Sequence, residues 1–70
     1  MKIYTQDRKR IIEMPKEVWI TECGSVSFIV GTSYSNPTLG TYEVSKAEGI
    51  LKEMFDYYRN GKNSYIMPEQ

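Results

Sequence analysis

The sequence predicts a small α+β domain: an antiparallel β-sheet of about five strands with one C-terminal amphipathic α-helix packed on one face. Three observations favour this fold. Short β-prone runs alternate with turn residues, and the first four runs form two N-terminal hairpins. A stretch of apolar residues at helical spacing follows the last run. The length of 70 residues fits a single domain over residues 1–70.

The first hairpin is expected to join residues 2–6 and residues 10–14 through the turn Asp7-Arg8-Lys9. Pro15 ends the second run because proline has no N–H to donate to a ladder. The second hairpin joins residues 18–23 and 26–32 through Gly24-Ser25. Glycine at the first central position is what a two-residue type II′ turn requires, because that position needs a positive φ.

Directly opposed residues of the second hairpin share one face of the sheet. With Gly24-Ser25 as the turn, Trp19 and Phe28 lie on one face, together with Thr21, Cys23, Val26 and Val30. We expect this face to form the core beneath the helix, with Cys23 as a buried structural thiol. The opposite face then leaves the cross-strand pair Ile20 and Ile29 uncovered.

After turn residues at 34–38, residues 39–44 are expected to form a fifth strand. Ser45-Lys46-Ala47-Glu48 matches a capping box, which predicts a helix over residues 46–60 with Gly61 at its C′ position. The apolar stripe of this helix consists of Ala47, Ile50, Leu51, Met54, Phe55 and Tyr58. Tyr65-Ile66-Met67 is expected to add a short last strand.

Composition excludes several function classes. The nine basic and nine acidic residues balance, so no large net field favours nucleic acid or anionic membranes. The chain has no histidine and one cysteine, which removes Ser-His-Asp and Cys-His triads, the usual zinc sites and an internal disulfide. We therefore expect a non-enzymatic protein without metal or cofactor. The absence of a long apolar run and of an N-terminal apolar segment predicts a cytoplasmic protein without membrane attachment.

Two surfaces are candidates for binding a protein partner. Ile20 and Ile29, with tyrosines such as Tyr57, form either ordinary apolar residues on a solvated face or a patch for a dimer or another protein. The polar side of the helix carries carboxylates that either support the helix, as Glu48–Lys52 and Asp56–Arg59 pairs, or form the rim of a docking surface. These carboxylates are Glu48, Glu53 and Asp56.

A third candidate is the basic turn Arg8-Lys9-Arg10, which is either a solvated turn or a phosphate-binding site. Three cations flanked by Asp7 and Glu13 are too few to indicate direct binding of nucleic acid.

Segments along nearly the whole chain carry a resemblance to known proteins: Ile3-Tyr4-Thr5-Gln6-Asp7 with Ile11-Ile12 and Pro15, Leu39-Gly40-Thr41-Tyr42-Glu43, the helix residues Ala47, Ile50-Leu51, Glu53-Met54 and Tyr57, and Tyr65-Ile66-Met67-Pro68-Glu69. In these segments the chain resembles a family of small, mostly uncharacterised proteins from phages and mobile elements of Firmicutes. It departs from the family pattern at Arg8, where relatives often carry glycine, and at Lys16-Glu17, where they often carry Tyr-Glu.

The resemblance implies a counter-defence protein in the host bacterial cytoplasm that binds and inhibits a bacterial defence effector. The most specific function that the resemblance implies is an anti-CRISPR inhibitor of an RNA-guided nuclease. One alternative is an oligomer that sequesters a nucleotide second messenger through Arg8, Arg10 and tyrosines. Another is an accessory homodimer without an inhibitory role.

Overall fold

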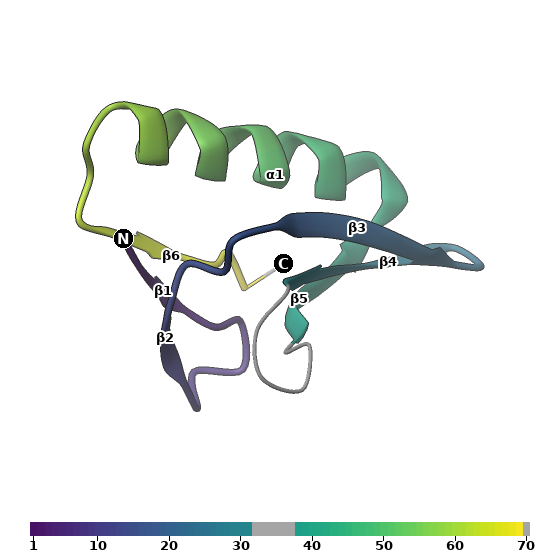
Figure 1. Ribbon diagram of the computed structural model, residues 1–70. Coiled ribbons are helices and arrows are strands. Elements are labelled where there is room, and N and C mark those ends of the chain that lie inside the picture. Colours follow the sequence, from purple (N-terminus) through teal and green to yellow (C-terminus); the bar gives the residue numbers. More distant parts are fainter. Residues whose placement is uncertain (32–37, 70) are drawn as a thin grey trace.

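The computed structural model describes residues 1–31 and 38–69, with Phe28 described by its backbone alone. Of the turn predicted at residues 34–38, residues 34–37 lie outside what is described, as does the predicted core position of the Phe28 side chain. Thr38, predicted in the turn, is the first residue of a strand. In chain order the described elements are β1 (Lys2–Tyr4), β2 (Ile11–Glu13), β3 (Val18–Cys23), β4 (Val26–Gly31), β5 (Thr38–Glu43), α1 (Val44–Arg59) and β6 (Ser64–Ile66) (Figure 1).

The α+β class is confirmed, and the strands are divided between two three-stranded sheets. β2-β1-β6 form one sheet and β3-β4-β5 the other. All pairings are antiparallel except β1 with β6, which is parallel. The helix α1 runs above both sheets and contacts β3, β4, β5 and β6 (Figure 1). Neither the division into two sheets nor the parallel pairing is visible in the local sequence pattern.

The second hairpin has the predicted register. Cys23 pairs with Val26 and Trp19 with Val30, and Gly24 takes a φ of 66° as a type II′ turn requires. Two-residue loops leave the strands little freedom to slip, which explains why this register follows from the turn alone.

The predicted choice of inner face is wrong. Ile29 is fully buried and Ile20 packs against the core, whereas Trp19 is 37% exposed and the predicted buried thiol of Cys23 is exposed. The face that carries Ile29 also carries small residues. The Tyr42 ring lies where a Cβ on Gly40 would come within 2.8 Å of its Cζ atom. Small residues therefore let bulky groups approach this face closely.

The helix begins at Val44, and the predicted capping box at Ser45 and Glu48 is wrong. Glu43 occupies the N-cap with an extended backbone and makes no side-chain cap bond, so Ser45 lies inside the first turn. The predicted C-terminus is confirmed. Gly61 has a φ of 75° and donates its N–H to Tyr58 O, while Lys62 N–H donates to Tyr57 O. These two bonds form a Schellman motif.

One hydrophobic core lies between the helix and the two sheets. The helix contributes Ala47, Ile50 and Met54, but the outer part of its predicted stripe is exposed: Phe55 by 57% and Tyr58 by 58%. The core consists of Ile3, Ile29, Leu39, Tyr42, Ala47, Ile50, Met54, Tyr65 and Met67.

Candidate interaction surface

The side chain of Gln6 clamps the first hairpin to β5 and to the C-terminal segment. Its Nε2 donates to Thr41 O (3.0 Å) and to Glu69 O (2.7 Å), and its Oε1 accepts from Thr41 N–H (2.6 Å). The backbone N–H of Gln6 also donates to Leu39 O (2.9 Å). One residue thus joins segments that are 35 and 63 positions away in the chain.

Arg8 folds back over its own hairpin instead of extending into solvent. Its guanidinium donates to Thr5 O (3.0 Å) and Met67 O (2.8 Å) and lies 5.1 Å from the centre of the Tyr4 ring. Its φ of 63° is in the left-handed region that favours glycine. The side-chain contacts of Arg8 offset the strain of this φ.

Two buried tyrosines continue the network. The Tyr42 hydroxyl donates to Pro68 O (2.6 Å), and the Tyr65 hydroxyl donates to Glu53 Oε1 (2.6 Å). Burial raises the pKa of Tyr42 to about 12. Burial, followed by the bond to the Glu53 carboxylate, raises the pKa of Tyr65 as well. Both hydroxyls therefore stay protonated and can donate at neutral pH.

The segments that carry the family resemblance meet in this network. Gln6 bonds Thr41 and Glu69, and Tyr42 bonds Pro68, so the opening, middle and closing segments hold one another in place. The structure thereby gives these segments a role in holding the fold together.

The predicted anchors Ile20 and Ile29 do not form an exposed patch. Ile29 is fully buried and Ile20 is partly buried against the core. The prediction that this pair lies on an open face is wrong because the helix covers that face of the β3-β4-β5 sheet.

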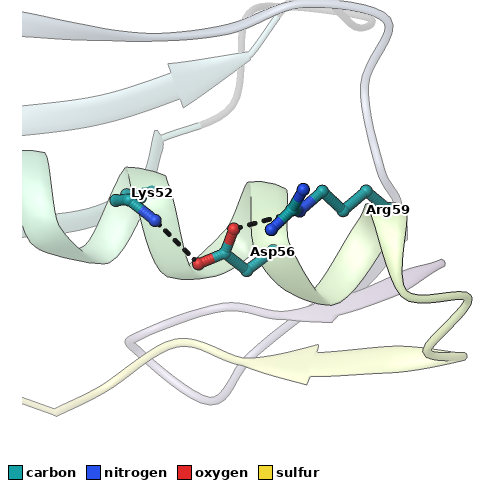
Figure 2. Close-up of polar contacts among 3 residues, drawn as sticks. All are labelled: Lys52, Asp56 and Arg59. Atoms are coloured by element: carbon teal, nitrogen blue, oxygen red, sulfur yellow. Dashed lines mark hydrogen bonds and ion pairs between the residues drawn. The ribbon is translucent and has the colours of Figure 1, made fainter.

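On the helix, Asp56 pairs with two cations (Figure 2). Lys52 Nζ lies 3.0 Å from Asp56 Oδ2 and Arg59 Nε lies 3.3 Å from Asp56 Oδ1. The Asp56–Arg59 pair is as predicted, but Lys52 pairs with Asp56 instead of Glu48. The bond from Lys52, followed by the charges of Lys52 and Arg59, lowers the pKa of Asp56. Exposed pairs of this kind support a helix by a few tenths of a kcal/mol.

The other residues predicted for the rim of a docking surface have different roles in the structure. Glu48 is exposed, while Glu53 accepts the Tyr65 hydroxyl. Tyr57 is exposed on one side and packs edge-on against Tyr65, with ring centres 4.9 Å apart. Glu53 and Tyr57 thus help to position Tyr65, and their outer edges remain open to a partner.

At the tip of the first hairpin, the side chains of Lys9 and Arg10 are exposed. The guanidinium of Arg8 instead donates to a backbone carbonyl of the same chain, Met67 O. Asp7 accepts from Lys9 N–H (3.0 Å) and from the Thr5 hydroxyl (2.8 Å), and these two bonds lower its pKa. The tip therefore presents two cations beside one ionised carboxylate.

An apolar groove runs between the C-terminal half of α1 and the segment that joins β2 to β3. It consists of two adjoining hollows, with volumes of about 550 and 230 Å³, that share Met14, Pro15, Lys16 and Phe55. We call it the Phe55 groove; its further lining residues are Met1, Val18, Leu51, Met54 and Tyr58. Pro15 is buried because its ring packs on Gly31, where a Cβ would overlap the ring.

The apolar spacing of the helix places Phe55 and Tyr58 in the core stripe, so the sequence pattern does not predict this groove. A signal was present: at about 100° per residue, Phe55 lies about 80° around the helix from Ala47, at the margin of the stripe. Tyr58 lies near the end of the helix, where the helix has passed beyond the β3-β4-β5 sheet (Figure 1). Both rings therefore have one side in contact with the protein and one side in solvent.

No family model, curated protein or solved structure matches the chain. Within residues 1–31 and 38–69 no helix is long and apolar enough to cross a membrane.

Proposed function

We propose that this chain is a non-enzymatic binding protein that covers a surface of a target protein with the Phe55 groove. The observation that carries the proposal is the exposure of Phe55 and Tyr58 beside Met14 and Pro15. Aromatic side chains with adjoining apolar hollows supply most of the binding energy in protein interfaces. Lys16 lines the groove and supplies a charged contact at its rim.

The resemblance described above supports a bacterial defence effector as the target, most specifically an RNA-guided nuclease. In this proposal the chain acts by masking a working surface of the effector at near-equal stoichiometry. Glu48 and Asp56 lie on the same helix as Phe55, so they are available as rim contacts at a larger interface. The basic turn has no part in this proposal, because Arg8 is held by Thr5 O and Met67 O.

The test is to express the tagged chain in a Gram-positive host that carries defence systems and to identify co-purifying proteins by mass spectrometry. The double variant F55S/Y58S removes both rings from the groove. Both rings are more than half exposed, so the variant is expected to fold. The matched control I11S removes a side chain that is 68% exposed on the other sheet.

We expect the control to recover a defence protein at near-equal stoichiometry and to block its activity, and we expect F55S/Y58S to do neither. Equal recovery and inhibition by the two folded variants would refute the groove as the binding surface. Recovery of the chain alone from every host would refute the inhibitor function.

A further inference from the structure

The Phe55 groove carries a positive charge among apolar and aromatic side chains. Among the described residues that line its two hollows, only Lys16 has a charged side chain. Lys16 is exposed, and within residues 1–31 and 38–69 no carboxylate pairs with it. Its neighbour Glu17 does not line either hollow. An ammonium group at the edge of an apolar surface attracts an anionic group that reaches the groove.

The wall that α1 contributes to the groove has an excess of positive charge. Lys52 and Arg59 lie three residues before and four residues after Phe55, a spacing that places all three on the same side of the helix. Both cations pair with the single carboxylate of Asp56 (Figure 2), so one positive charge remains in excess. Glu48, the next carboxylate on this side, lies about 10 Å from Phe55 along the helix axis, where salt screens its charge.

The smaller hollow, of about 230 Å³, has the lining of a side-chain pocket. Its walls include Met54, which is fully buried, and the partly buried Leu51 and Val18. Met14 and Phe55 line it as well and continue into the larger hollow. Thioether sulfurs make favourable contacts with the edges of aromatic rings, and aromatic rings favour one another. This lining therefore favours an aromatic ring as the occupant.

We propose that the segment of the target protein that enters the Phe55 groove carries an aromatic side chain next to a carboxylate. The ring fills the smaller hollow, and the carboxylate accepts a hydrogen bond from Lys16 Nζ, since Lys16 lines the same hollow. This inference rests on the proposed function, because it names the chemistry of the surface that the chain covers.

A segment of this kind differs from a surface that binds nucleic acid. Such a surface is basic, because it neutralises phosphate groups. Lys16 and the excess charge of Lys52 and Arg59 would repel it. We therefore expect the chain to cover an acidic protein-contact surface of its target, and to leave the nucleic-acid groove of the target uncovered.

The test uses two dipeptide probes that share an aromatic ring and carry opposite charges, acetyl-Phe-Glu amide and acetyl-Phe-Lys amide. Each probe is titrated into the isotope-labelled full chain at low salt, and binding is followed by the backbone amide NMR signals of Leu51, Phe55 and Tyr58. We expect the acidic probe to bind about fivefold more tightly than the basic probe, because one gains an exposed ion pair and the other meets a like charge. High salt should reduce this preference.

Three variants assign the preference to Lys16. K16M keeps the apolar stem and removes the charge, so the preference should fall below about twofold. K16E should reverse it. K9M is the matched control, because Lys9 is exposed at the tip of the first hairpin, and it should leave the preference unchanged. Lys16 is exposed as well, so all three variants should keep the wild-type circular dichroism spectrum.

Tighter or equal binding of the basic probe to wild type would overturn this inference, and so would an unchanged preference in K16M. Titrations in which neither probe shifts the groove signals would also overturn it. The proposed function is judged separately, by whether F55S/Y58S loses a target that I11S retains. For a retained target, the expected order of affinity is wild type, then K16M, then K16E.

Discussion

Replacing Gln6 with alanine removes the clamp between the first hairpin, β5 and the C-terminal segment. Three side-chain hydrogen bonds are lost, two to the backbone of Thr41 and one to Glu69 O. A neutral hydrogen bond contributes about 1 kcal/mol net, and water replaces part of that at a half-buried site. We therefore expect Q6A to lower the free energy of unfolding by about 2 kcal/mol.

That loss is large for a domain of this size. A chain of 70 residues is expected to have a free energy of unfolding of about 4–10 kcal/mol. For so small a domain, about 2 kcal/mol corresponds to a fall in Tm of about 10 °C. Thermal unfolding followed by far-UV circular dichroism measures it, with K9A as the control because Lys9 is exposed on the same hairpin. A Q6A protein that melts within about 2 °C of K9A would refute the clamp.

Three further predictions concern the core, the helix and alkaline pH. I29A should lower the free energy of unfolding by about 3 kcal/mol, because Ile29 is fully buried; a loss below about 1 kcal/mol in urea unfolding would contradict its place in the core. G49A should raise the free energy of unfolding by about 1 kcal/mol, because a Cβ at Gly49 meets nothing within 4 Å; an unchanged or lower Tm would contradict this. The pKa of Tyr42 is raised from 10.0 to about 12 in the folded state, so its contribution to stability is complete below pH 10 and is lost as pH rises toward 12. Urea unfolding between pH 8 and 12 should show that decline, and a flat profile would contradict it.

The second hairpin could be predicted from the sequence, down to its register, because the determinant is local. Gly24 sets the turn, and the turn sets which residues oppose one another. The end of α1 is predictable for the same reason, since Gly61 provides the left-handed residue of a Schellman motif.

The inner face of that hairpin could not be predicted from local pattern, because both faces carry apolar residues. Trp19 is the larger side chain, but Ile29 is the one that the helix covers. The choice depends on contacts across the chain, in particular on Tyr42 lying over Gly40 beneath the helix. The parallel pairing of β1 with β6 has the same origin: Lys2 opposes Ser64, and no short-range signal links them.

The residues that hold the fold together are different from the residues that line the Phe55 groove. Gln6, Thr41 and Tyr42 are engaged in bonds that hold the fold, so changes there act on stability first. Phe55 and Tyr58 contribute little to the core and lie on a helix that is already anchored by its other side. Proteins that share the clamp can therefore keep this fold while presenting different side chains in the groove. Under the function proposed above, the groove residues set the identity of the target, and exchanging Phe55 and Tyr58 should change binding at nearly constant stability.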